Sequence, residues 1–281
     1  MKHIVFFSGG IGSWMTAKRV IEKHGKEDVV LLFTDTLIED EDLYRFIKET
    51  VAEMGVEFIR LSDGRTPWDV YRDVRFLGNS RLAPCSHHLK QKVADVWIRD
   101  NFKPEKQYTE STLDYWEQDE REQAVLYLGI DWTEIHRTKA PMKNWKPYRV
   151  EFPMCEQPYM SKDEMLQQLS NLGIEVPRLY KMGFSHNNCG GFCCRAGQGH
   201  FANLLKQLPE RYAEAELKEE QMREYLNKDV SILVKTVKKS KKQYTLRQLR
   251  EDIELKKQID MNDIGGCGCF VSDEYDEESP L

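Results

Sequence analysis

Six residues near the N-terminus combine two serines with three glycines, a composition typical of a loop that wraps an anion. The segment Ser8-Gly9-Gly10-Ile11-Gly12-Ser13 follows an apolar run and precedes a helical pattern. A glycine-rich turn between a strand and a helix points backbone N–H groups, and the positive end of the helix dipole, at one place. Phosphate is the usual occupant, and the serine hydroxyls add donors. Neither the Walker pattern nor the dinucleotide-binding pattern is present in the sequence.

Seven cysteines form the second set of residues with chemical potential. Cys189 and Cys193 are spaced Cys-x₃-Cys in a glycine-rich stretch, and Cys267 and Cys269 lie in another. These four thiols are a candidate ligand set for one metal centre. The alternative ligands are Cys155, Cys194, His186 and His200.

Three interpretations of these cysteines fit the sequence. Structural zinc usually binds Cys-x₂-Cys pairs, so the wider spacing favours an iron–sulfur cluster, with zinc as the alternative. Cys267 and Cys269 could instead serve as a thiol-exchange pair. Plain buried or surface thiols would explain the pattern without any metal.

Three further side chains lie where a phosphate ligand would need them. Cys85 precedes a helix predicted to begin at Ser86, and this position lowers a thiol pKa; a small apolar filler is the alternative. Lys90, in the first turn of that helix, is a candidate phosphate contact. Arg137 follows a predicted strand, where parallel sheets place ligand groups, and it could offset charge; a surface ion pair is its alternative.

The elements that would position these residues alternate between strand and helix. Apolar runs predict strands over 2–7, 29–35, 56–62 and 124–130. Helical spacing predicts helices over 13–25, 40–54, 86–102, 161–173 and 245–259, with two more between 200 and 226 separated at Pro209. This order predicts an α/β fold with an open, mainly parallel sheet covered on both faces.

A change in the sequence pattern near residue 148 predicts the domain organisation. We expect a nucleotide-binding α/β domain at 1–148, a mostly helical, cysteine-bearing extension at 149–270, and an acidic tail at 271–281. The 281 residues carry a net charge of −6, yet residues 235–250 hold seven basic side chains and no acid. Such a run is either a solvated surface or a contact for nucleic acid.

No apolar run is long enough to span a membrane, and no signal peptide precedes the first strand. The sequence therefore predicts a cytoplasmic protein without a membrane partner. It does not indicate an oligomeric state.

The loop at 8–13 resembles the SGGxDS signature of the PP-loop ATP pyrophosphatase superfamily, which includes the phosphoadenosine phosphosulfate (PAPS) reductases. Ordered motifs extend the resemblance over about residues 1–140, namely Leu32-Phe33-Thr34-Asp35-Thr36, Pro84-Cys85-Ser86 with Leu89-Lys90, and Leu128-Gly129-Ile130 with Glu134 and Arg137. It implies a fold of the adenine-nucleotide α-hydrolase type and a loop that binds ATP or sulfonucleotide phosphates.

By the same resemblance, Thr34, Asp35, Lys90 and Gly129 join the loop as nucleotide-binding residues. Lys90, Glu134, Arg137 and Cys85 become catalytic candidates, and Mg²⁺ becomes a possible cofactor. The four-iron cluster of some sulfonucleotide reductases and tRNA thiolases adds to the cluster interpretation.

Two positions depart from the family pattern. Gly12 replaces the aspartate of SGGxDS, and Asp131 replaces the arginine that follows Gly-Ile. The first change removes a carboxylate that could bind Mg²⁺, which Asp35 or Asp131 would have to replace. Loss of this carboxylate would affect cleavage of the bond between the α- and β-phosphates of ATP, and would not affect nucleotide binding.

Three functions fit these observations. The first is a PAPS reductase-like PP-loop enzyme that binds ATP and activates a substrate by adenylation, for sulfur transfer or for nucleoside or nucleic-acid modification. The second is a sulfonucleotide reductase that releases sulfite. The third is a nucleotide-binding or nucleic-acid-associated module without catalysis.

Overall fold

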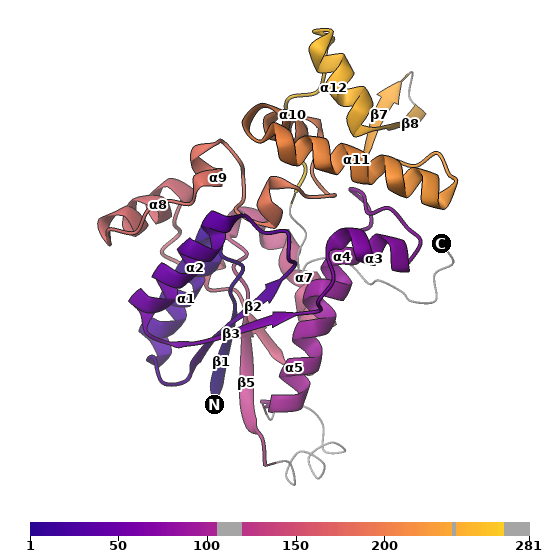
Figure 1. Ribbon diagram of the computed structural model, residues 1–281. Helices are drawn as coiled ribbons and strands as arrows, with labels where there is room; N and C mark the ends of the chain where they lie inside the picture. Colours follow the sequence, from indigo (N-terminus) through magenta and orange to yellow (C-terminus); the bar gives the residue numbers. More distant parts are fainter. Residues whose placement is uncertain (106–119, 238–239, 267–281) are drawn as a thin grey trace. The chain divides into compact units, whose positions relative to one another are not determined.

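The computed structural model describes residues 1–105, 120–237 and 240–266 (Figure 1). The chain divides into two compact units, each built from separate stretches. The sheet unit contains Met1–Asp35, Glu41–Asp63 and Lys90–Pro177. The helical unit contains Thr36–Asp40, Gly64–Leu89 and the chain from Arg178 onward.

This division differs from the contiguous domains expected from the sequence, with their boundary at 148. Residues beyond 148 belong to the sheet unit because the strand Arg149–Glu151 pairs with the sheet. In addition, Arg19 donates hydrogen bonds to the carbonyls of Pro153 and Glu156 at 2.6 and 3.1 Å. The predicted acidic tail at 271–281 lies outside the described residues.

The sheet unit is built on a six-stranded sheet whose pairings are all parallel. The strand order is β3-β2-β1-β5-β4, and β6 also pairs with β5. Its strands are β1 (Lys2–Phe6), β2 (Val29–Asp35), β3 (Glu57–Ser62), β4 (Phe102–Pro104), β5 (Glu122–Tyr127) and β6 (Arg149–Glu151). The α/β fold with an open, mainly parallel sheet is confirmed.

Helices cover both faces of the sheet. The helices α1 (Ile11–His24) and α2 (Glu41–Met54) lie on one face, and α5 (Val93–Asn101) lies on the other (Figure 1). All seven residues of β2 are buried, as expected for a central parallel strand with covered faces. Because every strand is parallel, the segments that follow β1, β2, β3 and β5 emerge at the same edge of the sheet.

The helix predicted from Ser86 begins two residues earlier. It starts at Pro84, with Ala83 as the N-cap, so the prediction that it begins at Ser86 is wrong. Proline is well suited to the first helical position, because it lacks the N–H that would have no acceptor there. The helix runs through α4 (Pro84–Ser86), the π-helical segment η1 (His87–Lys92) and α5.

The remaining elements of the sheet unit are short, apart from one capped helix. They are η2 (Trp132–Thr138), α7 (Lys139–Asn144), η3 (Pro153–Cys155) and α8 (Lys162–Asn171). Ser161 and Glu164 form a complete capping box at the start of α8, as the sequence pattern predicts.

The helical unit packs its helices and a β-hairpin around buried apolar side chains. Its core includes Phe201, Leu204, Tyr212, Leu246 and Leu249, all of them 0% exposed. The elements of the unit are α3 (Pro67–Asp73), α4, α9 (Arg178–Lys181), η4 (Cys189–Gly191), α10 (Gln198–Gln207), α11 (Pro209–Leu226), β7 (Leu233–Val237), β8 (Ser240–Tyr244) and α12 (Leu246–Glu254).

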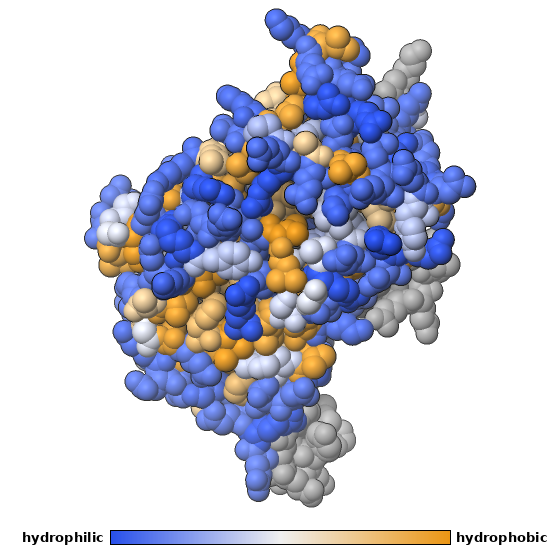
Figure 2. Space-filling model, viewed as in Figure 1, coloured by the Kyte–Doolittle hydropathy of each residue, from blue (hydrophilic) through white to orange (hydrophobic). Residues whose placement is uncertain are grey.

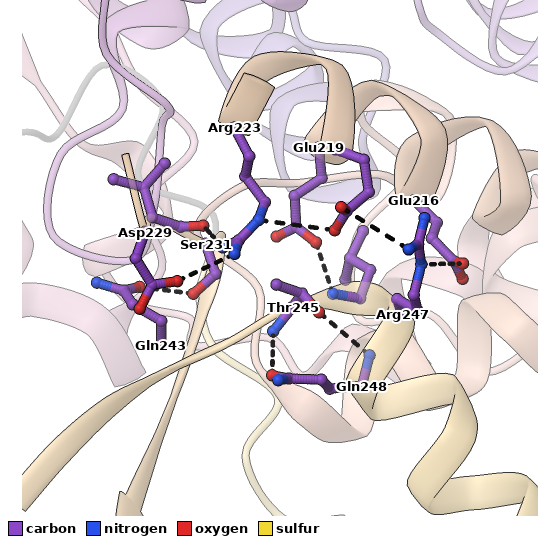
Figure 3. Close-up of polar contacts among 12 residues, drawn as sticks. Glu216, Glu219, Arg223, Asp229, Ser231, Gln243, Thr245, Arg247 and Gln248 are labelled. Atoms are coloured by element: carbon purple, nitrogen blue, oxygen red, sulfur yellow. Dashed lines mark hydrogen bonds and ion pairs between the residues drawn. The ribbon is translucent and has the colours of Figure 1, made fainter. Parts of the chain in front are cut away.

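A buried carboxylate ties the hairpin and α12 to α11. Glu219, which is 0% exposed, accepts hydrogen bonds from the backbone N–H of Ile232 at 2.8 Å and of Leu246 at 2.6 Å (Figure 3). Burial raises the pKa of this carboxyl to about 7. The two N–H groups that it satisfies flank the hairpin, so Glu219 holds both ends of β7–β8 in place.

Among the described residues, no helix is long and apolar enough to cross a membrane. The face drawn in Figure 2 carries mostly hydrophilic residues, with hydrophobic residues in scattered patches.

Candidate functional site

The loop between β1 and α1 has the backbone geometry that an anion-binding turn requires. Gly9 has a φ of +74°, and a Cβ at this position would lie 2.9 Å from Cγ of Leu43. Gly10 is the N-cap of α1 and contributes no side-chain cap. The start of a 14-residue helix therefore lacks the usual serine or aspartate cap, as expected where a bound anion takes that role.

The two serines of this loop lie together. Ser13 Oγ donates to the carbonyl of Gly10 at 2.8 Å and accepts from the backbone N–H of Ser8 at 3.2 Å. The two hydroxyl oxygens are 3.4 Å apart. These contacts close the loop on itself and place two hydroxyl groups at the beginning of α1.

The backbone of Gly12 lies directly against that of Gly129, beyond the end of β5. A Cβ on Gly129 would lie 3.0 Å from the carbonyl carbon of Gly12 and from the nitrogen of Ser13, and a Cβ on Gly12 would lie 3.3 Å from the oxygen of Gly129. This close approach gives a physical reason for glycine at position 12, where the family pattern has aspartate. It also brings Gly129 to the loop.

Asp35, the last residue of β2, is fully buried and firmly held. Its carboxylate accepts from the Tyr44 hydroxyl at 2.9 and 3.1 Å and from Arg60 Nε at 2.9 Å. The Arg60 guanidinium lies over the Tyr44 ring, 5.2 Å from its centroid. Because these donors engage Asp35, and Gly12 offers no carboxylate, neither residue presents a ready Mg²⁺ site.

Tyr44 and Arg60 were not among the residues predicted from the sequence. The available signal was Arg60 itself, a lone cation within the apolar run of β3. Its partner Tyr44 comes from a different element, α2, and no local pattern links the two.

The other predicted residues of the sheet unit are distributed as follows. Thr34 is buried in β2 next to Asp35, and Lys90 is 4% exposed within η1. Glu134 and Arg137 form an ion pair with each other on η2. The Arg137 charge is therefore offset locally by Glu134. Asp131 caps η2 by accepting from the backbone N–H of Thr133 at 2.8 Å.

In the helical unit, two thiols and a phenol meet. The Tyr71 hydroxyl donates to Cys85 Sγ at 3.3 Å, and Cys85 Sγ lies 3.9 Å from Cys194 Sγ. The contact with Cys85, together with burial, raises the pKa of Cys194 well above its usual range. Burial and the two neighbouring thiols likewise raise the pKa of Tyr71. Both groups are therefore protonated at neutral pH.

The glycine turn that carries Cys189 is held by buried charges of the 36–40 segment. Glu39 accepts a hydrogen bond from the backbone N–H of Cys189, which has a φ of +55°. Arg211 donates to the carbonyl of Gly190 at 2.9 Å. The fully buried Asp40 forms an ion pair with Arg178, with an N–O distance of 2.7 Å. The contact with Arg211 gives the glycine turn at position 190 a structural role.

The structure does not assemble the predicted metal ligands into a site among the residues that it describes. In residues 1–105, 120–237 and 240–266, no three His, Cys, Asp or Glu side chains are placed to hold a metal ion. Cys155 lies in the sheet unit, where its thiol donates to the carbonyl of Ile130 at 3.3 Å. Cys267 and Cys269 lie outside the described residues. The described cysteines therefore do not by themselves fit an iron–sulfur cluster or zinc.

Cys194 is expected to resist alkylation in the native protein. Its burial and raised pKa leave little thiolate at pH 8, so iodoacetamide should label it only after unfolding in urea. Mass spectrometry of digests prepared before and after unfolding measures this. Labelling of native Cys194 as fast as in the unfolded chain would contradict the assignment.

The chain was compared with protein families, with curated proteins and with solved structures. No protein-family model matches it, and no curated protein matches it. Among solved structures, it is similar to a phosphoadenylyl-sulfate (PAPS) reductase from Candida auris in a phosphate complex, with 10% identity over 66% of this chain and 78% of the other, at a TM-score of 0.40.

Two further structures are similar to this chain. One is an NH₃-dependent NAD synthetase from Campylobacter jejuni in complex with nitrate, with 13% identity over 80% of this chain and 84% of the other, at a TM-score of 0.31. The other is the U34-tRNA thiolase NcsA from Methanococcus maripaludis with its [4Fe-4S] cluster, with 14% identity over 79% and 73% and a TM-score of 0.41. The similarity is distant, so residue roles depend on the geometry of this chain.

Proposed function

We propose that this protein is a PP-loop superfamily enzyme that binds the phosphates of an adenine nucleotide at the loop of residues 8–13 and activates a substrate by adenylation. The observation that carries the proposal is the uncapped start of α1, where a glycine turn and the paired hydroxyls of Ser8 and Ser13 converge. Backbone dipoles and hydroxyl donors at one point favour a phosphate group over a neutral ligand.

In the proposed reaction, an oxygen of the substrate attacks the α-phosphorus of ATP. A bond forms between that oxygen and phosphorus, and the bond to pyrophosphate breaks. The loop would stabilise the charge that develops on the departing pyrophosphate. Lys90 and Arg137 are the candidates for neutralising further phosphate charge, and Glu134 would orient Arg137 through their ion pair.

A Ser13→Ala substitution tests the loop. We expect the dissociation constant for ATP to rise about tenfold, because the variant lacks the hydroxyl that would turn from the Gly10 carbonyl to the phosphate. A hydroxyl hydrogen bond to a charged group is worth roughly 1.5 kcal/mol. Isothermal titration calorimetry on the full chain measures the change. The matched control is Ser170→Ala, which removes a helix hydroxyl that donates to the carbonyl of Leu166 at 3.0 Å. Equal ATP affinity in both variants and the parent would contradict phosphate binding at the loop.

A second candidate function, sulfonucleotide reduction, is supported by the proximity of Cys85 and Cys194. In this reaction the Cys85 thiolate attacks the sulfur of a phosphosulfate, forming an S-sulfocysteine and releasing the nucleotide phosphate. The Cys194 thiol must then lose its proton to attack Cys85 Sγ; a disulfide forms, and sulfite leaves and can take up that proton. A dithiol reductant would restore both thiols.

Offering the protein ATP and PAPS in parallel distinguishes the two functions. Adenylation predicts tighter binding of ATP, together with pyrophosphate release once an acceptor is supplied. Reduction predicts sulfite release from PAPS in the presence of a dithiol, and loss of that release in both Cys85→Ser and Cys194→Ser variants.

A further inference from the structure

A cavity of about 500 Å³ lies within the helical unit, separate from the loop at 8–13. Its lining comes from the segment 75–81, from the end of α11 with the residues that follow it, and from the hairpin β7–β8. Five cations line it, and no acidic side chain does. They are Arg75, Arg81, Lys228, Lys241 and Lys242.

Among the described residues, no carboxylate pairs with the cations of this cavity. Throughout the part of the chain that the structure describes, none of the five cations takes part in an ion pair. All five side chains belong to exposed residues. The guanidinium of Arg75 lies over the ring of Tyr225, 5.6 Å from the ring centroid, in a cation–π contact. Five uncompensated cations around one concavity attract a ligand that carries several negative charges.

The cavity is also lined by apolar side chains. The buried Leu77 and Leu226 form its floor, the half-buried Phe76 and Val230 lie beside them, and Val234 is exposed. A ring of cations around an apolar floor suits a ligand with both charged and flat apolar parts. Nucleotides in a single strand have this combination, because the phosphates are charged and an unstacked base presents two apolar faces.

The hairpin that carries Lys241 and Lys242 is fixed in place. Ser231 Oγ lies 2.6 Å from Gln243 Oε1 and accepts from the backbone N–H of Tyr244 at 2.9 Å (Figure 3). Glu219 holds the backbone on both sides of the hairpin. The rim is thus positioned before any ligand arrives, which lowers the entropic cost of binding.

The opposite rim is shaped by a turn. The side chain of Asn79 accepts from the backbone N–H groups of Arg81 and Leu82 at 3.0 and 3.2 Å. This turn presents Ser80 and Arg81 at the surface of the cavity.

We infer that this cavity binds single-stranded nucleic acid, with phosphates on the cationic rim and a base on the apolar floor. A single phosphate would need only one or two of the cations, and an acidic peptide would leave the apolar floor unfilled. The inference adds a macromolecular partner to the proposed function and does not depend on it, because it concerns a different part of the chain.

Fluorescence anisotropy with labelled 12-nucleotide RNA and DNA tests this, using the full chain between 50 and 250 mM salt. The double variant Lys241→Gln/Lys242→Gln is expected to lower affinity about 25-fold at 0.1 M salt. It should also reduce the slope of log K against log salt by about 1.4, as for two lost phosphate contacts. The matched control is Lys206→Gln/Lys256→Gln, which removes the same charge from exposed positions outside the cavity lining.

Three results would overturn the inference. These are absence of oligonucleotide binding by the parent chain, equal loss of affinity in the two double variants, and competition by polyglutamate as strong as by oligonucleotide at equal charge. A preference for RNA or for DNA would identify the natural partner. Titration of ATP in the same variants keeps the tests distinct, because ATP affinity should be unchanged by substitutions at 241 and 242.

Discussion

Substituting Gly190 with alanine is expected to destabilise the helical unit by more than about 3 kcal/mol, the range of severe core lesions. A Cβ at this position would lie 1.5 Å from an Arg211 guanidinium nitrogen and 2.6 Å from the carbonyl oxygen of Ile38. The residue also has a φ of +57°, which alanine adopts only with strain. Arg211 would have to abandon the carbonyls of Gly190 and Ile38, and the backbone around Ile38 would have to move.

Urea unfolding of the full chain measures this effect, and Gly64→Ala is the matched control. Gly64 also belongs to the helical unit and has a φ of +90°, but a Cβ there would meet no atom within 4 Å. The control therefore isolates backbone strain, expected to cost about 1–2 kcal/mol. If both variants lose the same free energy of unfolding, steric conflict with Arg211 does not explain the need for glycine.

The second large effect is a dependence of stability on pH that originates at Glu219. Burial raises the pKa of this carboxyl to about 7 in the folded protein, from 4.5 for an unperturbed glutamate. The folded state therefore binds the proton more tightly than the unfolded state does. The contribution of Glu219 to stability is complete below about pH 4.5 and is lost as the pH rises to about 7. The total loss is about 3 kcal/mol.

Comparison with Glu219→Gln isolates this contribution. The variant cannot ionise, although its amide leaves one of the two backbone N–H groups facing a donor, at a cost of about 1–3 kcal/mol. The stability advantage of the parent over the variant should shrink between pH 4.5 and 7.5. Glu220→Gln, at the adjacent half-buried position, is the control. Parallel stability profiles for parent and Glu219→Gln would show that Glu219 does not titrate in this range.

Local patterns in the sequence were sufficient to predict the centre of the sheet. The runs at 2–7, 29–35, 56–62 and 124–130 correspond to β1, β2, β3 and β5. Three of these strands are largely buried, and buried parallel strands are continuous apolar stretches bounded by turns; β3, at the sheet edge, has no buried residue. The three-residue strands β4 and β6 could not be found in this way, since so short a strand has no periodicity. The hairpin β7–β8 was not predicted because four of the five residues of β8 are exposed and polar, so no alternation of apolar and polar residues marks the strand.

The cysteines show the same limit in the candidate site. Spacing along the chain drew attention to Cys189 and Cys193, which are close in sequence. The thiol contact that the structure describes joins Cys85 to Cys194, 109 residues apart, and a buried tyrosine completes it. Contacts between such distant residues arise from tertiary packing and leave no trace in local spacing. Tyr44 and Arg60 reach Asp35 from different elements in the same way.

The assembly of the helical unit from three separate stretches constrains how this protein can be made and divided. During synthesis, its first two stretches emerge early and must wait for the chain beyond Arg178 before their core can close. Until then, apolar side chains such as Tyr71 and Leu77 lack most of their native neighbours. For the same reason, no single cut of the chain separates the two units: a protein truncated at Pro177 would retain fragments of a core that it cannot complete.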